Sequence, residues 1–198
     1  DGVHITARTA AGAFYARATL AQLVRQYGDS VPYLVIEDWP DLAVRGVMLD
    51  VSRDRVPTMA MLRLWIDRLA ALKINQLQLY MEHTFAYPSH PEVWRTASPF
   101  TADEIRELDA LCQARHIDLV PCQNGFRHME RWLIHERYAD LAITHAPRLS
   151  AMGDPRLPST LNPLDPRSLE LVASIYDDLL PHFSSRLFND SADEPFEL

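Results

Sequence analysis

Apolar positions recur at two different spacings along the chain, and their alternation predicts its secondary structure. Strand-like runs, in which apolar residues are continuous or alternate with polar ones, cover residues 46–51, 75–81, 117–122 and 186–189. Helix-like runs, with apolar residues three and four apart, cover residues 59–72, 101–115, 128–142 and 166–180. Strands that alternate with helices in this way are typical of βαβ units with parallel pairing. The pattern therefore predicts four consecutive βα units.

The first 41 residues follow a different order. Residues 3–8 alternate as a strand would, residues 12–27 have helical spacing, and residues 31–37 read as a second strand. We expect residues 1–41 to be the C-terminal part of a small α/β domain that ends in the turn residues 38–41. Residues 42–198 would then hold the four βα units.

Four βα units fit either half of an eight-stranded barrel or a small open doubly wound sheet. Chemically rich residues follow each predicted strand, at residues 50–53, 82–83, 123–124 and 193–194, as they do at the C-terminal face of a barrel. No glycine-rich turn follows the first strand, as a nucleotide-binding open sheet would usually show. The fold class predicted is α/β, the N-terminal half of a (β/α)8 TIM barrel.

Composition limits the partners. The 27 acidic residues exceed the 19 lysines and arginines, for a formal charge of -8 without a basic run, which disfavours nucleic acid. No apolar run approaches the roughly 18 residues that cross a bilayer, so we expect no membrane partner. No zinc-type cluster or phosphate loop is visible, so neither a metal nor a cofactor is implied. Unpaired Cys112 and Cys122 favour a reducing, cytoplasmic compartment, but the location is left open.

Two adjacent carboxylates, Asp193 and Glu194, end the fourth predicted strand. Carboxylates in different environments allow one to act as an acid while its neighbour stays ionised. Successive strand residues point to opposite faces, so both can serve one pocket only if the strand bends or ends there. Pro195 favours such an end because it biases Glu194 away from helix and cannot extend the ladder. A solvated acidic turn is the alternative interpretation.

Further candidates stand near the other strands. The donors of Arg45, ahead of the first strand, could hold a hydroxyl-rich ligand. Glu82 and His83, after the second strand, could bind sugar hydroxyls, and Asn124 follows the third strand. His128 could donate to a ligand or to a catalytic carboxylate. For each residue the alternative is an ordinary structural role on the surface or at a helix end.

The order of these motifs resembles glycoside hydrolase family 20, the β-N-acetylhexosaminidases. The segment RGVMLDVSR carries the most specific likeness, and TADEIRELDALCQARHIDLVP is similar to the helix that leads into the third barrel strand. The segment LFNDSADE falls where the family carries an Asp-Glu pair on strand four. The resemblance covers nearly the whole chain, and it implies a small α/β domain followed by a (β/α)8 barrel.

The resemblance also implies roles for single residues. Glu194 would be the general acid and base, and Asp193 would orient the 2-acetamido group of the substrate, whose carbonyl oxygen attacks the anomeric carbon. Arg45 would bind sugar hydroxyls, and His128 would support the acid. The implied activity is the removal of terminal N-acetyl-β-hexosamine (GlcNAc or GalNAc) with retention of configuration, and the implied partner is a carbohydrate ending in that sugar.

The chain departs from the family pattern at several positions. Ser191-Ala192 stand where two glycines are usual, Glu82-His83-Thr84 replace an acidic pair, and Phe126-Arg127-His128 replace Pro-Gly-His. These changes leave open a noncatalytic aminosugar-binding or structural module. In the family four further strands follow the Asp-Glu pair, so we expect a fragment of a longer enzyme, or self-association through open barrel edges.

Overall fold

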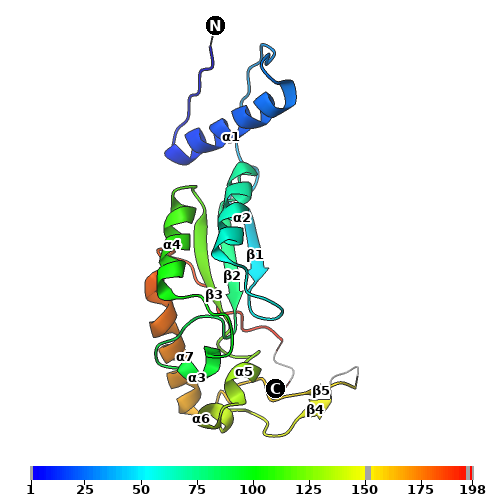
Figure 1. Ribbon diagram of the computed structural model, residues 1–198, viewed down its shortest axis with the longest axis vertical. Helices are drawn as coiled ribbons and strands as arrows, with labels where there is room; N and C mark the ends of the chain where they lie inside the picture. Colours follow the sequence, from blue (N-terminus) through cyan, green and yellow to red (C-terminus); the bar gives the residue numbers. More distant parts are fainter. Residues whose placement is uncertain (1, 150–152, 195–196, 198) are drawn as a thin grey trace.

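A parallel three-stranded sheet is the centre of the fold. The computed structural model describes residues 2–149, 153–194 and 197 (Figure 1). Strands β1 (Gly46–Asp50), β2 (Gln76–Met81) and β3 (Asp118–Gln123) lie in the order β1-β2-β3. Gly46 is opposite Gln76, and Gln76 is opposite Asp118, so the three strands begin and end nearly level. Their carboxyl ends therefore meet at one edge.

Two helices connect these strands and cover the sheet. Helix α2 (Met59–Ala71) has Thr58 as its N-cap residue, and helix α4 (Ala102–Gln113) has Thr101. The spacing of Thr101 and Glu104 forms a capping box: the Thr101 hydroxyl accepts from the Glu104 amide, and the Glu104 carboxylate accepts from the Thr101 amide. Both helices bury an apolar stripe, formed by Leu62, Ile66 and Ala70 in α2 and by Ile105, Leu108 and Cys112 in α4.

The fourth βα unit is present in reduced form. Helix α7 (Pro166–Leu179) and the 3-10 turn η1 (Leu180–His182) lead back to the sheet, where Asn189 forms a parallel bridge with Cys122. The predicted strand at residues 186–189 is limited to this bridge, because only Asn189 exchanges backbone hydrogen bonds with β3, at 3.0 Å each. The parallel order and the covering helices confirm a partial α/β barrel.

The N-terminal segment keeps its predicted helix but lacks its predicted strands. Helix α1 (Ala10–Tyr27) lies at the amino ends of the strands, where the Tyr15 hydroxyl donates to the His116 carbonyl at 3.3 Å (Figure 1). The strands predicted at residues 3–8 and 31–37 are wrong. A strand is stabilised by pairing, and no described residue pairs with either segment. Tyr33 and Val35 accordingly remain 97% and 91% exposed.

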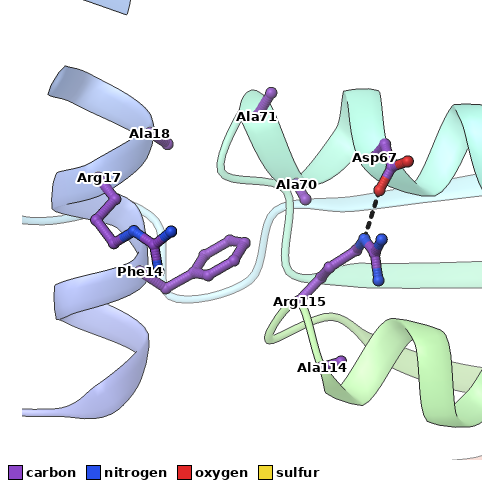
Figure 2. Close-up of a pocket in the computed structure, with 8 residues that line it drawn as sticks. All are labelled: Phe14, Arg17, Ala18, Asp67, Ala70, Ala71, Ala114 and Arg115. Atoms are coloured by element: carbon purple, nitrogen blue, oxygen red, sulfur yellow. Dashed lines mark hydrogen bonds and ion pairs between the residues drawn. The ribbon is translucent and has the colours of Figure 1, made fainter. Parts of the chain in front are cut away.

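A cavity of about 500 Å³ separates α1 from the ends of α2 and α4. Figure 2 shows Phe14 and Arg17 of α1 facing the Asp67–Arg115 ion pair, whose Oδ1 and Nε atoms are 2.5 Å apart. This cavity belongs to the amino-terminal edge of the sheet. It is therefore at the opposite end from the residues that follow the strands.

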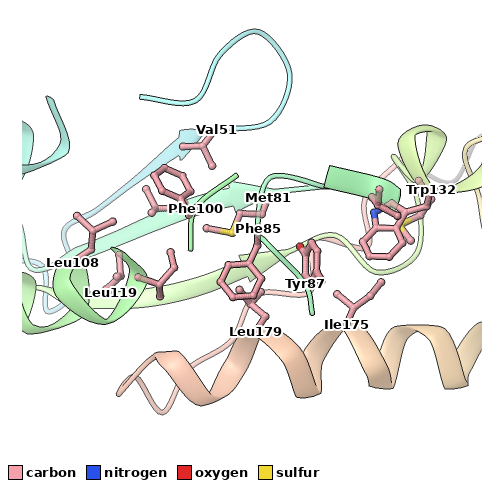
Figure 3. Packing of buried hydrophobic residues seen from close by; sticks show 14 of the residues in the cluster. Val51, Met81, Phe85, Tyr87, Phe100, Leu108, Leu119, Trp132, Ile175 and Leu179 are labelled. Carbon is pink, nitrogen blue, oxygen red and sulfur yellow. The ribbon is translucent and has the colours of Figure 1, made fainter. Parts of the chain in front are cut away.

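A second part of the core lies below the carboxyl ends of the strands. Phe85 and Tyr87 stack edge to face at 5.1 Å and meet Trp132 on one side and Leu179 of α7 on the other (Figure 3). The helix predicted at residues 128–142 is split into α5 (Glu130–Leu133) and α6 (Glu136–Ala139), because His135 is extended. Short helix α3 (Pro91–Trp94) packs nearby.

Between the segments with helical spacing at residues 128–142 and 166–180, the chain holds a small antiparallel pair of strands that the sequence pattern did not indicate. Strands β4 (Arg148–Leu149) and β5 (Pro155–Arg156) form it. The predicted free thiols are confirmed, since Cys112 and Cys122 are both buried and unpaired. Among the helices of the described residues, none is both long and apolar enough to span a bilayer.

Candidate active site

The carboxyl edge of the sheet gathers polar side chains from every βα unit. Ser52 and Arg53 follow β1, Glu82 follows β2, and Asn124 follows β3. Asp193 and Glu194 lie beyond the bridge at Asn189. In parallel barrels this edge is where binding and catalytic residues collect. The candidate site described below consists of His128 and five of these side chains: Arg53, Glu82, Asn124, Asp193 and Glu194.

Glu82 is the buried acid of the site. It is 6% exposed, and the Tyr80 hydroxyl donates to its Oε1 atom at 3.0 Å. Its backbone is fixed on both sides, because its amide donates to Ser52 Oγ at 2.8 Å and its carbonyl accepts from Trp132 Nε1 at 2.7 Å. Burial raises the pKa of Glu82 from 4.5 to about 7, although the Tyr80 hydrogen bond opposes the rise.

His128 lies between two carboxylates. Its Nδ1 atom is 4.0 Å from Glu82 Oε1, and its Nε2 atom is 3.6 Å from Glu194 Oε2. The turn that presents it is built on Asn124, whose Oδ1 atom accepts from the amides of Phe126 and Arg127 at 3.2 and 3.1 Å. His128 itself has a left-handed backbone with φ of 56°. The imidazole is thus held where it can exchange protons with either acid after a small movement.

Asp193 and Glu194 turn toward the same histidine. One ligand atom each of His128, Asp193 and Glu194 lies within 4.8 Å of the others. Consecutive strand residues could not converge in this way, but here the backbone leaves the sheet after Asn189 and Glu194 has φ of 54°. Asp193 Oδ1 is 3.5 Å from Asn124 Nδ2, which also donates to the Tyr80 hydroxyl at 3.2 Å. The chain therefore bends as the shared pocket requires.

Arg127 is a site residue that the sequence reasoning did not single out. Its Nη1 atom is 3.0 Å from Glu194 Oε2, and its side chain is only 14% exposed. His128, Asp193 and Glu194 together could reach one metal cation, but the Arg127 guanidinium already forms an ion pair with the Glu194 carboxylate. A second cation there would meet charge repulsion, so the cluster is better suited to proton transfer than to metal binding.

Arg45 does not join the other predicted site residues. It precedes β1 and lies at the amino edge, where its Nε atom donates to the Lys73 carbonyl at 2.7 Å and its Nη1 atom donates to the Leu42 carbonyl at 2.8 Å. Its guanidinium also covers the ring of Tyr15 at 5.4 Å. A residue before a parallel strand is separated from the carboxyl edge by the length of that strand, which is the physical reason for the correction.

Arg53 occupies the position that Arg45 was expected to fill. It lies beyond the end of β1, forms an ion pair with Asp50, and covers the ring of Tyr80 at 5.1 Å. Its side chain is 58% exposed, so a ligand at this edge can reach it. The signal was present in the sequence, since Arg53 is among the residues that follow the first strand.

His83 is adjacent to Glu82 but differs from it in environment. It is 8% exposed, and burial lowers its pKa to about 4, with the charge of Arg131 adding to the effect. The ring is therefore neutral near pH 7. Its Nδ1 atom has no hydrogen-bond partner among the described residues. The structure thus supports a neutral buried imidazole and shows no contact of His83 with Asp193 or Glu194.

The fold and these contacts define a class of protein: part of a (β/α)8 barrel with a carboxylate and histidine site at the carboxyl ends of its strands. Comparison with known families agrees. The family model "Glycosyl hydrolase family 20, catalytic domain" matches residues 43–197, and "Glycosyl hydrolase family 20, domain 2" matches residues 1–39. The chain belongs to glycosyl hydrolase family 20, which confirms the resemblance seen in the sequence.

Individual relatives give the same assignment. A Beta-hexosaminidase of Akkermansia muciniphila is 28% identical over 224 residues, which cover 100% of this chain and 44% of the relative. An N,N'-diacetylchitobiase of Vibrio harveyi is 40% identical over 100 residues, or 50% of this chain and 10% of the relative.

Solved structures show the same fold. A mutant Streptomyces plicatus beta-hexosaminidase in complex with product (GlcNAc) matches with a TM-score of 0.76 and 29% identity, over 98% of this chain and 44% of that one. The GH20 beta-N-acetylhexosaminidase from Streptomyces coelicolor A3(2) matches with a TM-score of 0.75 and 27% identity, again over 98% and 44%. The chain therefore spans less than half the length of these proteins.

Proposed function

We propose that this chain carries the acid and base machinery of a retaining N-acetyl-β-hexosaminidase, which removes terminal GlcNAc or GalNAc. The observation that carries the proposal is the position of His128 between buried Glu82 and exposed Glu194, with Asp193 beside Glu194. Family membership and the beta-hexosaminidase relatives support it. A single acid beside a second carboxylate that is free to orient the substrate fits substrate-assisted hydrolysis.

In the first step Glu194 donates its proton to the glycosidic oxygen, and the bond from that oxygen to the anomeric carbon breaks. The carbonyl oxygen of the substrate's own acetamide attacks the anomeric carbon from the other face and closes a cyclic oxazolinium ion. The Asp193 carboxylate accepts from the acetamide N–H and stabilises the positive charge that develops there. The enzyme supplies no nucleophile, so the two carboxyl groups need not face each other across the sugar.

In the second step Glu194, now a carboxylate, removes a proton from water. The water oxygen attacks the anomeric carbon and opens the cyclic ion, so the sugar leaves with its original configuration and Glu194 is protonated again. His128 lies between Glu194 and Glu82, so it can return a proton to Glu194 when that acid has lost one to solvent, and Glu82, whose pKa is about 7, can supply that proton near neutrality. Arg53 is the cation placed to bind hydroxyls of the sugar at the same edge.

One observation favours a second function, a noncatalytic aminosugar-binding module. Arg127 forms an ion pair with the Glu194 carboxylate at 3.0 Å. The family resemblance leads one to expect glycine at position 127, and a glycine there would leave Glu194 without this partner. A general acid must carry a proton before it can donate one. If this ion pair persists in the bound state, Glu194 would not deliver a proton, and the site would bind the sugar without cleaving it.

The test uses the full-length protein and the aryl N-acetyl-β-glucosaminide. We expect release of p-nitrophenol, no comparable release from the aryl β-glucoside that lacks the acetamide, and loss of at least about 100-fold in kcat for Glu194→Gln. Glu170→Gln, an exposed position on α7, is the matched control and should keep wild-type activity. Adding azide to Glu194→Ala should restore turnover and yield the β-glycosyl azide.

Calorimetric binding of N-acetylglucosamine without any turnover by the full-length protein would support the binding module instead. Equal hydrolysis of the aryl glucoside would exclude participation of the acetamide.

Self-association through open barrel edges remains a proposal as well. The outer edge of β1 has no pairing partner among the described strands, and Met48 in that strand is 58% exposed. Analytical ultracentrifugation of the 198-residue chain should detect a dimer at micromolar concentration, whereas a single stable monomer over that range would count against the proposal.

A further inference from the structure

The segment that bears Asp193 and Glu194 is anchored at both ends. At its start Asn189 exchanges two backbone hydrogen bonds with β3, and its side chain donates to Gln78 Oε1 at 2.8 Å. The described residues that follow, 190–194, belong to no strand, and two of them, Ser191 and Glu194, have left-handed backbones. Their positions therefore depend on side-chain contacts, such as those of Ser191 with Cys122 and of Glu194 with Arg127, and on what holds the segment beyond Glu194.

Glu197 provides the second anchor. Its Oε1 atom accepts from the Thr144 hydroxyl at 3.2 Å, and its Oε2 atom accepts from the amide and hydroxyl of Ser159 at 3.3 and 3.4 Å. Burial alone would raise the pKa of Glu197, but the hydrogen bonds from Ser159 and Thr144 help to outweigh burial, and the pKa is lowered. The charged carboxylate thus joins both ends of the loop at residues 144–160.

The base of that loop also holds the histidine turn. The Ser159 carbonyl accepts from the Met129 amide at 2.9 Å, and the Leu161 amide donates to the Phe126 carbonyl at 2.9 Å. These two bonds flank Arg127 and His128, the residues that contact Glu194. Residues 159–161 consequently contact both Glu197 and the histidine turn. The amide and hydroxyl of Ser159 bind Glu197, and the Ser159 carbonyl and Leu161 amide bind the turn that carries His128.

We propose that Glu197 is a positioning residue that fixes the Asp193-Glu194 pair against His128 through the base of the 144–160 loop. This role rests on the proposed hydrolase function. Among the described residues Glu197 forms no hydrogen bond or ion pair with Glu194 or His128, so it acts through residues 159–161, whose backbone holds the turn that carries His128. A displacement of about 1 Å at reacting groups costs roughly 100-fold in rate, and a loosened anchor would permit a displacement of that size.

The experiment measures kcat and KM for the full-length wild type, Glu197→Ala, Glu197→Gln and the exposed control Glu170→Ala on the aryl N-acetyl-β-glucosaminide. We expect Glu197→Ala to lower kcat by about 10- to 100-fold with KM changed less than about threefold. Glu197→Gln keeps one acceptor oxygen and should recover part of that loss. Glu170→Ala should match wild type, and the melting temperatures of all variants are recorded as a check of folding.

The outcomes separate this inference from the function on which it rests. An inactive wild type would reject the hydrolase function. If the wild type is active and Glu197→Ala keeps more than half of the wild-type kcat, the positioning role is overturned. The role is also overturned if Glu197→Ala loses kcat and folded fraction equally and Glu197→Gln recovers neither. A double-mutant cycle with Ser159→Ala gives a second measurement: the two kcat losses should be strongly non-additive if both residues act through one contact, and additive if they do not.

Discussion

Replacing Glu82 by glutamine removes a buried ionisable group with little change in shape, and the structure indicates how the effect should vary with pH. Burial raises the pKa of Glu82 from 4.5 to about 7, and the side chain is 8% exposed, so solvent screens little of this effect. Each pKa unit corresponds to about 1.36 kcal/mol. Charging Glu82 in the folded protein therefore costs about 3 kcal/mol more than in the unfolded chain.

The sign follows from which state loses its proton first. Below pH 4.5 Glu82 is protonated in both the folded and the unfolded protein, so ionisation of Glu82 takes nothing from the free energy of unfolding. As pH rises from 4.5 through 7 the unfolded chain ionises first, so the folded state of the wild type loses stability. Glu82→Gln does not titrate. Relative to wild type, its free energy of unfolding should therefore increase by about 2.5 kcal/mol between pH 5 and pH 8.

Urea denaturation of wild type and Glu82→Gln at pH 5 and pH 8 measures this difference, and effects of other titrating groups cancel between the two proteins. Glu170→Gln on exposed α7 is the control and should show no such pH dependence. A Glu82→Gln minus wild-type difference that is the same at both pH values would refute the reasoning that burial keeps Glu82 protonated near neutrality.

Other substitutions test the assignment of the two arginines and the strained turn. Arg53→Ala should lower kcat/KM by about 10- to 100-fold, as expected for loss of a charged hydrogen bond of about 1.5–3 kcal/mol. Arg45→Ala should instead lower the free energy of unfolding by about 1–2 kcal/mol and leave KM unchanged. The reverse result would return Arg45 to the site. Ser191 has φ of 47° and shares a 3.0 Å contact with Cys122 Sγ, so Ser191→Val should destabilise by roughly 1–3 kcal/mol while Ser191→Gly stays near wild type, both measured by urea denaturation. Equal stability of the valine and glycine variants would show that the left-handed backbone at this position carries no strain.

Features set by neighbouring residues could be predicted from the sequence. The capping box of α4 depends on Thr101 and Glu104, which are three residues apart, and the structure has the bonds that this spacing implies. Strands β1, β2 and β3 are apolar over most of their length. Along the chain they alternate with helices whose apolar residues have clear helical spacing. Their parallel order followed from the alternation alone.

Features that depend on distant partners could not be predicted in this way. Residues 31–37 have the composition of a strand, but a strand needs a neighbour, and no described residue supplies one. Arg45 was assigned to the site from its motif, although a residue before a parallel strand lies at the opposite edge from the site. The contacts of Arg127 and Glu197 join segments far apart in sequence, and no local spacing signals them.

In the proposed hydrolysis the substrate's own acetamide is the nucleophile, with Asp193 orienting it and Glu194 serving as the acid and base. The most direct test of this mechanism compares the full-length enzyme on aryl β-glucosaminides whose N-acetyl group carries zero, one, two or three fluorine atoms. Fluorine withdraws electrons from the carbonyl oxygen, so kcat/KM should fall steeply with each added atom if that oxygen is the nucleophile. Rates that do not depend on fluorination would contradict substrate-assisted catalysis.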